Sequence, residues 1–218
     1  MFRIFGPPGT GKTTTLLNLV DKALEEGTPP HRIAFLAFTR KAANEAKERA
    51  AVRFNLDPKH DLIFFRTLHS LALTMSDIRS EQVMQEENYR ELSRAIGVEL
   101  GGQKNTSIDD DVPSMVASSD PILGLINLAR LRKVPLRDQY DISDIEHDWN
   151  TVNFVDKCWR EYKESMGLFD FTDMLEHFAN GDEKFCPEFD LCFLDEAQDL
   201  SPLKWDIAQL LDRRSKKL

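Results

Sequence analysis

The stretch Gly6-Pro7-Pro8-Gly9-Thr10-Gly11-Lys12-Thr13-Thr14 matches the complete pattern G-x-x-x-x-G-K-[ST] of a phosphate-binding loop. The apolar run at residues 2–5 precedes it and favours a buried strand, and residues 15–20 follow with apolar side chains at helical spacing. Strand, loop and helix are the context that this motif requires. In that context the glycines let backbone N–H groups converge on phosphates, and the helix adds the positive end of its dipole. We therefore predict a nucleotide site formed by the residues from Gly6 to Thr14.

Two side chains of the loop have chemically distinct tasks at such a site. Lys12 supplies a positive charge for the β- and γ-phosphates of a nucleoside triphosphate. Thr13 offers its hydroxyl to Mg²⁺, a hard cation that keeps most of its waters and takes few protein ligands. A second Mg²⁺ ligand is therefore expected elsewhere in the chain.

The composition is that of a globular protein. With 218 residues, of which 41% are hydrophobic and 30% charged, the chain can build one sizeable core, alone or with a small insertion. No uninterrupted apolar run approaches the ~20 residues that a membrane helix needs. Because no charged leader, apolar signal core and cleavage site open the chain, we expect a soluble cytoplasmic protein without a membrane partner.

The cysteines and the charges bear on which kinds of site the protein can contain. Cys158, Cys186 and Cys192 are too few and too irregular for a disulfide framework, and without a C-x-x-C pair we expect buried thiols rather than a zinc site. Residues 1–80 hold 12 Lys and Arg against 8 Asp and Glu, whereas residues 81–218 hold 16 against 29. Any contact with nucleic acid is therefore expected in the N-terminal part, since Lys and Arg neutralise phosphates.

The order of apolar segments predicts a parallel sheet. The first helix should end near Gly27, before a buried strand at residues 33–38 and a helix at residues 40–53. A third buried strand is predicted at residues 62–65, followed by a helix that begins at Leu71. This alternation of strand and helix implies right-handed crossovers, with ligand groups gathered at the carboxyl ends of the strands.

The alternation stops after about Ser80. Apolar residues then recur at helical spacing, and residues 121–131 read as a further helix, with no strand evident. We predict an α/β fold in which residues 1–79 and 166–218 form the nucleotide-binding domain. Residues 80–165 are predicted to form a mostly helical insertion.

A second chemical site is predicted where the sheet resumes. Residues 189–194 are strand-like and lead into Asp195-Glu196-Ala197-Gln198-Asp199. An acidic pair at the end of such a strand suits a phosphate-loop enzyme, with Asp195 holding Mg²⁺ and Glu196 orienting and polarising the attacking water. The prediction gains its force from the complete phosphate loop in the same sheet.

Together these motifs resemble the first RecA-like domain of superfamily 1 DNA helicases of the UvrD/Rep/PcrA type. The resemblance covers nearly the whole chain, because five segments occur in the order that the family shows. They are Gly6 to Thr14 (motif I), Phe38-Thr39-Arg40-Lys41-Ala42-Ala43 (motif Ia), Thr67-Leu68-His69-Ser70-Leu71-Ala72 (the Thr-Phe-His segment), Gly167 to Leu175 (the Asp-Phe-x-Asp-Leu segment) and Asp195 to Asp199 (motif II).

The resemblance implies a RecA-like phosphate-loop NTPase that uses ATP and Mg²⁺ and moves 3′ to 5′ on single-stranded DNA. It implies that Gln198 joins Lys12, Asp195 and Glu196 as a catalytic residue and couples the nucleotide state to the DNA surface. Asp170 and Asp173 are expected to cap a helix instead. The implied DNA-binding residues are Phe38, Thr39, Arg40, Thr67 and His69.

For two of these positions the residue type alone leaves an alternative open. Phe38 would stack on a base, a contact worth ~1–3 kcal/mol, but an aromatic residue there could equally belong to the core. His69 would contact the strand, but it could equally be a buried, hydrogen-bonded histidine.

The chain also departs from the family pattern at both ends. The upstream glutamine segment that recognises adenine is absent, and so are motif III and the second RecA-like lobe, whose arginines stabilise the transferring phosphoryl group. Because such arginines are worth ~10³–10⁵ in rate, we expect a helicase fragment or truncated form that binds nucleotide and turns it over slowly. The second lobe is then an expected partner.

Two other functions fit parts of the pattern. A non-catalytic, ATP-dependent module that binds nucleic acid or regulates a partner could use the loop and Asp195 as a switch. A phosphate-loop kinase acting on a small molecule is the other, but residues 80–165 show no evident acceptor pocket or mobile basic lid.

Overall fold

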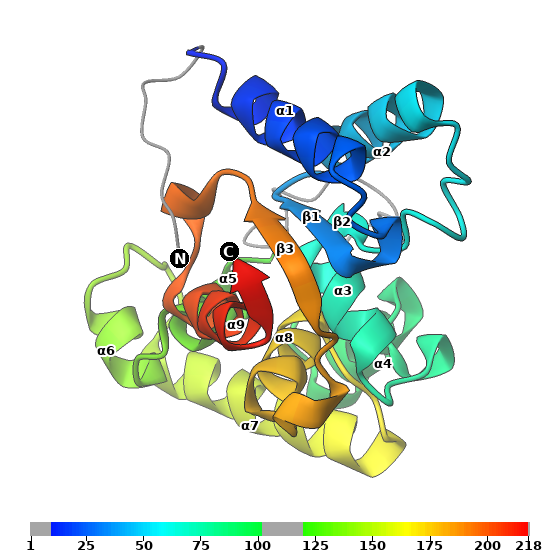
Figure 1. The fold of residues 1–218 in the computed structure, drawn as a ribbon. Coiled ribbons are helices and arrows are strands. Elements are labelled where there is room, and N and C mark those ends of the chain that lie inside the picture. The colour runs from blue at the N-terminus through cyan, green and yellow to red at the C-terminus, as the bar shows by residue number, and fades with distance from the viewer. Residues whose placement is uncertain (1–9, 102–119, 218) are drawn as a thin grey trace.

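A computed structural model describes residues 10–101 and 120–217 of the chain. The predicted strand at residues 2–5 and the first four loop residues, Gly6, Pro7, Pro8 and Gly9, lie outside the described residues. The fold is α/β, as predicted, with helices on both faces of one sheet (Figure 1).

The described strands are all parallel and lie in the order β2-β1-β3-β4. Parallel neighbours place the carboxyl ends of the strands at one edge of the sheet, where α/β proteins bind their ligands. The strands are β1 (Ile33–Ala37), β2 (Phe65–Thr67), β3 (Phe189–Leu194) and β4 (Ser215–Lys217).

The central strand β1 is buried on both faces, and its side chains alternate between two cores. Ile33, Phe35 and Ala37 pack into one core with α1 (Lys12–Glu25) and α2 (Arg40–Phe54). Figure 1 shows these two helices side by side above the sheet. The nearly continuous apolar run that predicted this strand is therefore explained by burial on both sides.

The other face of β1 carries Ala34 and Leu36, which pack into the second core. Three helices cover this face: α3 (Leu68–Met75), α8 (Phe171–Asn180) and α9 (Pro202–Arg213). Helix α8 thus packs on the sheet again, although it follows residues 80–165 in the sequence.

The prediction of a strand at residues 62–65 was wrong in its bounds. Leu62 and Phe64 are buried, but the carbonyl of Leu62 accepts the N–H of Phe65 at 3.2 Å in a turn, and β2 begins only at Phe65. A buried turn and a buried strand give the same apolar run, so hydrophobicity alone does not separate them. The following helix begins at Leu68 rather than Leu71, because Thr67 caps it.

Strand β4 was not predicted by the apolar pattern. Its residues pair with β3 through Phe189 beside Ser215, and the N–H of Phe189 donates to the carbonyl of Arg214 at 3.0 Å. Backbone hydrogen bonds need no apolar side chains, so a polar and basic segment at the edge of a sheet carries no hydrophobic signal.

Helix α1 ends at Glu25 and is followed by Gly27 at φ 85°, which confirms the predicted end near this glycine. A left-handed residue just past a helix is the usual place for glycine. The short 3-10 helices of the described chain are η1 (Pro30–Arg32), η2 (Ser80–Gln82), η3 (Glu183–Phe185) and η4 (Ala197–Asp199).

Helices dominate the stretch in which no strand was predicted. The predicted helix at residues 121–131 is confirmed as α5 (Pro121–Arg132). The other helices described there are α4 (Glu86–Ile96), α6 (Leu136–Asp141) and α7 (Trp149–Met166).

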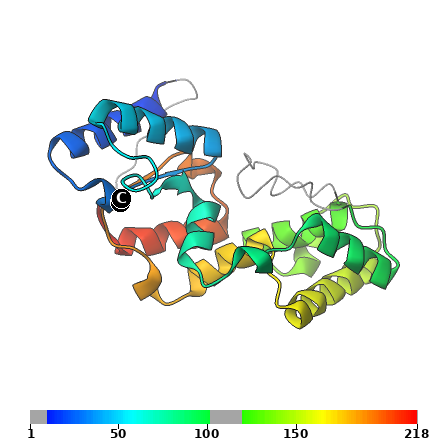
Figure 2. The same ribbon diagram turned by 90° about the vertical axis from the view of Figure 1, so that its right-hand side faces the viewer.

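These helices have a core of their own. Trp159 lies in its centre, where the indole N–H donates to the sulfur of Met84 at 3.2 Å. Figure 2 shows α4 to α7 grouped to one side of the sheet and the helices that cover it. The division into a nucleotide-binding domain, residues 1–79 and 166–218, and an insertion at residues 80–165 stays a prediction.

The three cysteines carry free thiols, with Cys186 and Cys192 buried and Cys158 half-buried. Burial raises the pKa of the Cys186 thiol to about 11, so it is protonated and unreactive at neutral pH.

Residues 10–101 and 120–217 contain no cluster of three or more His, Cys, Asp or Glu that could hold a metal ion. Within the same ranges every helix is too short or too polar to cross a lipid bilayer.

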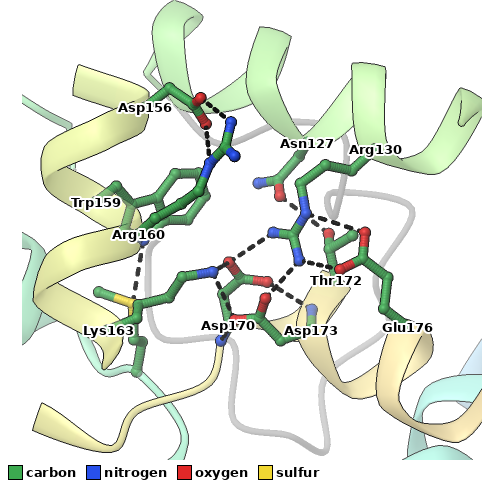
Figure 3. A network of polar contacts seen from close by, with 11 residues as sticks. Asn127, Arg130, Asp156, Trp159, Arg160, Lys163, Asp170, Thr172, Asp173 and Glu176 are labelled. Atoms are coloured by element: carbon green, nitrogen blue, oxygen red, sulfur yellow. Dashed lines mark hydrogen bonds and ion pairs between the residues drawn. The ribbon is translucent and has the colours of Figure 1, made fainter. Parts of the chain in front are cut away.

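A partly buried network of charges joins α5 and α7 to the start of α8 (Figure 3). Arg130 of α5 binds Asp170, Asp173 and Glu176 at 2.8, 2.5 and 2.7 Å. Lys163 of α7 binds Asp170 and Asp173 at 2.5 and 2.6 Å. Helices α5 and α7 are therefore both tied to the start of α8.

The predicted capping role of Asp170 and Asp173 is confirmed. Asp170 accepts the N–H of Asp173 at 2.8 Å, and Asp173 accepts the N–H of Asp170 at 2.7 Å, which together form a capping box. Burial alone would raise the pKa of Asp170, but the charges of Arg130 and Lys163 outweigh it and hold that pKa below its ordinary value. Asp170, with 1% of its surface exposed, is therefore a buried anion that depends on its cations.

Substituting Arg130→Met is expected to destabilise the chain by about 3–5 kcal/mol, because it leaves buried carboxylates short of positive charge. Arg213→Met is the matched control, since Arg213 forms a 2.7 Å pair with Glu183 in which both side chains are about half exposed. An exposed pair of this kind contributes ~0–1 kcal/mol. Urea unfolding of both variants measures the two costs, and equal costs would show that the network does not support the fold.

Candidate nucleotide and nucleic-acid site

The residues predicted to carry the chemistry meet at the carboxyl edge of the sheet. Phe38 and Thr39 follow β1, Thr67 ends β2, and Asp195 follows β3. The N–H of Asp195 donates to the carbonyl of Leu36 at 2.9 Å, so the sheet pairing continues up to the acidic residue itself. The parallel direction of the strands thus gathers residues that lie far apart in the sequence.

The described part of the phosphate loop leads directly into α1. Gly11 has φ 79°, a left-handed conformation that strains any residue with a Cβ, and its carbonyl accepts the N–H of Thr15 at 2.8 Å. Lys12 is the first helical residue, and Thr10 and Thr14 on either side of this turn are exposed. The first N–H groups of a helix are free to bind an anion, so this turn is suited to phosphate.

Thr13 and Asp195 are in direct contact. The Thr13 hydroxyl donates to Oδ2 of Asp195 at 2.9 Å, across 182 positions of sequence. Asp195 is 5% exposed, and its other oxygen accepts the N–H of Glu196 at 3.1 Å. The first turn of α1 and the end of β3 are therefore held together by the two residues that were predicted to share a metal ion.

This pair of donors fits Mg²⁺. A hydroxyl and one carboxylate are a typical protein contribution to an octahedral Mg²⁺ site, because phosphates and waters supply the other ligands.

Glu196 and Gln198 lie immediately beyond the buried aspartate. Glu196 has φ 52°, a left-handed conformation that is uncommon for a residue with a side chain and is often found at functional sites. Its carboxylate accepts a hydrogen bond from the amide of Gln198, which is exposed. The two side chains therefore form a polar pair at the rim of the site.

Thr39 and Thr67 begin the helices that follow the first two described strands. The hydroxyl oxygen of Thr39 accepts the N–H of Ala42 at 3.2 Å, and that of Thr67 accepts the N–H of Ser70 at 3.3 Å. Both are N-caps, a role that the sequence analysis did not assign to them. Capping uses an oxygen lone pair, so each hydroxyl still has a proton to donate. Arg40 follows as the first residue of α2.

Phe38 and His69 line one small pocket together with Lys204 and Asp195. The ring of Phe38 is half-buried, and the ammonium of Lys204 lies 4.6 Å from its centre. His69 Nε2 is buried without a hydrogen-bond partner among the described residues. Burial, and secondarily the charge of Lys204, lowers the pKa of His69 to about 3.

Comparison with known proteins agrees with this geometry. The family described as UvrD/REP helicase N-terminal domain matches residues 2–218. The chain belongs to this family. The predicted resemblance to helicases of the UvrD/Rep/PcrA type is thereby confirmed.

Relatives of known name cover nearly all of the chain. The ATP-dependent DNA helicase PcrA of Leuconostoc citreum is 26% identical over 99% of this chain and 29% of its own length. The putative ATP-dependent DNA helicase YjcD of Bacillus subtilis is 26% identical over 93% of this chain and 27% of its own length. PcrA of Staphylococcus aureus is 23% identical over 99% of this chain and 30% of its own length. The chain thus spans less than a third of the length of these relatives.

One residue of the pocket of Phe38 and His69, Lys204, was not singled out from the sequence. Lys204 lies in the first turn of α9, behind the cap formed by Ser201, whose hydroxyl accepts the N–H of Lys204 at 3.4 Å. A cation in the first turn of a helix opposes the helix dipole, and this signal could have singled it out from sequence. It was overlooked because the lysine lies outside the motif segments.

Because His69 is held neutral in the fold, the free energy of unfolding is expected to decrease in acid. The folded pKa of His69, about 3, lies below the ordinary value of 6.5, so between these values the unfolded chain binds the extra proton. The contribution of neutral His69 to the free energy of unfolding is therefore complete above pH 6.5. It is lost as the pH falls toward 3, at up to about 1.4 kcal/mol per pH unit.

Urea unfolding above and below pH 6.5 tests this expectation, with His69→Gln as the variant in which the acid-dependent loss becomes smaller. His147→Gln is the control, because His147 is exposed. If His69→Gln and the unsubstituted chain lose stability equally in acid, then His69 is not held neutral in its pocket.

Proposed function

We propose that this chain binds ATP with Mg²⁺ and single-stranded DNA side by side, as the ATP-binding part of a DNA helicase. The observation that carries the proposal is the hydrogen bond of 2.9 Å between Thr13 and Asp195. It brings the last residues of the phosphate motif to the acidic pair, which is what nucleotide binding with a metal requires.

The nucleotide would lie with its phosphates at the first turn of α1. Lys12 would neutralise charge on the β- and γ-phosphates. The backbone N–H groups of the loop and of this turn would donate to phosphate oxygens, except at the two prolines, which have no N–H. The loop residues besides Lys12 are Gly6, Pro7, Pro8, Gly9, Thr10, Gly11, Thr13 and Thr14. Thr13 and Asp195 would hold Mg²⁺, which would offset the negative charge that develops on the phosphates during hydrolysis.

Glu196 would act on the attacking water, and Gln198 would couple the nucleotide state to the DNA surface. The Glu196 carboxylate, beside the buried Asp195, is the acceptor that would orient the water for in-line attack. Gln198 donates to that carboxylate, so a movement of Gln198 would change the position of Glu196. This pair is our candidate for the link between nucleotide state and the neighbouring DNA surface.

The DNA strand would run along the residues that follow β1 and β2. Phe38 would stack on a base, and the cap residues Thr39 and Thr67 would use their remaining hydroxyl protons at phosphates. Arg40 and His69 complete the proposed surface. Its place in the chain agrees with the excess of positive charge in residues 1–80.

The wider activity is part of the same proposal. Translocation 3′ to 5′ and the need for a second RecA-like lobe come from the helicase resemblance, and cytoplasmic residence is proposed with them. The names of the relatives support ATP use and action on DNA for those proteins.

Lys12→Ala is expected to weaken the binding of a non-hydrolysable ATP analogue by roughly ten- to a hundredfold, because a charged hydrogen bond is worth about 1.5–3 kcal/mol. Lys22→Ala, in the same helix and 69% exposed, is the matched control and should bind normally. Asp195→Asn should abolish the gain in affinity that Mg²⁺ provides. Isothermal titration with and without Mg²⁺ measures all three, and normal affinity of Lys12→Ala would exclude the loop as the nucleotide site.

Phe38→Ala is expected to weaken binding of a labelled oligothymidylate by about five- to a hundredfold, the range that follows from losing one stacked base at ~1–3 kcal/mol. Phe154→Ala is the control, because Phe154 is an exposed phenylalanine on α7, away from the sheet edge. Fluorescence anisotropy gives both affinities. Equal affinities would remove Phe38 from the proposed DNA surface and favour a nucleotide switch that moves no DNA.

A further inference from the structure

Lys204 occupies an electrostatically unfavourable place. It lies in the first turn of α9, where the helix dipole presents its positive end, and that turn contains no acidic residue. Burial lowers the pKa of its ammonium group. Among the described residues no carboxylate lies within ion-pair distance of it. The ammonium group instead lies over the ring of Phe38, 4.6 Å from the ring centre.

A second side chain in the lining of this pocket, His69, has a polar atom without a partner among the described residues. His69 Nε2 is shielded from solvent and makes no hydrogen bond within the described chain. Held neutral by its surroundings, the imidazole can carry its proton on Nε2 and donate it. A buried donor of this kind costs free energy unless something binds to it. The pocket therefore lacks an acceptor, and the nearby ammonium favours a negatively charged one.

The Asp195 carboxylate does not fill this role. Although Asp195 lines the same pocket, its oxygens accept hydrogen bonds from Thr13 and from the N–H of Glu196, and it accepts none from His69 Nε2. The pocket lies at the carboxyl edge of the sheet, and its lining includes Phe38 after β1, His69 after β2 and Asp195 after β3. That position lies on the proposed path of the DNA strand, so the missing acceptor has an identifiable source.

We propose that Lys204 is a further nucleic-acid contact residue, whose ammonium binds a phosphate oxygen of single-stranded DNA next to the base that Phe38 holds, with His69 facing the same pocket. This inference rests on the proposed function. It deepens that function by adding to the DNA surface a residue of α9, beyond the segments that follow β1 and β2.

The test is the salt dependence of DNA binding. Each phosphate contact on a single strand contributes about 0.7 to the slope of log affinity against log salt concentration. Lys204→Met keeps the aliphatic stem and removes the charge, so it should lower the slope by about 0.7 and weaken binding about tenfold at low salt. Lys204→Arg should retain both the slope and the affinity.

Lys22→Met is the matched control for loss of one positive charge. Lys22 lies near the end of α1 with its side chain 69% exposed, and α1 starts at the carboxyl edge and runs away from it. Its substitution should leave the slope unchanged. The melting temperature of Lys204→Met should stay the same or rise, because a buried ammonium without a carboxylate is unfavourable, whereas a merely structural lysine would lower it.

Anisotropy with a fluorescein-labelled oligothymidylate over a series of salt concentrations gives the slopes, and titration with a non-hydrolysable ATP analogue gives the nucleotide affinity. An unchanged slope in Lys204→Met, with Phe38→Ala still impaired, overturns the role of Lys204 and leaves the proposed function standing. Loss of nucleotide affinity with normal DNA binding would assign the pocket to a nucleotide phosphate and also overturns it. If the unsubstituted chain binds no oligonucleotide, both proposals fail.

Discussion

The parallel direction of the strands is the constraint on which the rest of the structure depends. It brings the ends of β1, β2 and β3 to one edge, and the hydrogen bond from Thr13 to Asp195 then fastens the first turn of α1 to that edge. A reversed strand would send its terminal residue to the opposite edge of the sheet. The proposed nucleotide and DNA surfaces are neighbours for this reason alone.

The two surfaces share a boundary rather than a separate connecting element. Asp195 faces Thr13 on one side and lines the pocket of Phe38, His69 and Lys204 on the other. A small displacement of the segment after β3 would therefore alter both surroundings at once. The charged network at the start of α8 is arranged differently, because it joins helices behind the sheet and contributes rigidity away from this edge.

Local chemistry made much of this predictable. The phosphate motif, the apolar strands and the acidic pair each have a strict residue pattern, and the family match agrees with them. The pattern did not predict the start of β2, because a buried turn has the same apolar residues as a strand. It did not predict β4 either, because that strand depends on backbone pairing. The pairing of Arg130 with Asp170 was equally invisible, since only the folded chain brings residues 40 positions apart together.

The threonine caps restrict which sequences this edge can tolerate. Serine, threonine, aspartate and asparagine all cap helices well, so stability alone would accept any of them at positions 39 and 67. The proposed donation of a proton to phosphate excludes aspartate, whose ionised carboxylate would repel the strand, and keeps the two alcohols and asparagine, whose amide N–H can donate. A mutant library selected for folding should therefore be broader at Thr39 and Thr67 than one selected for DNA binding.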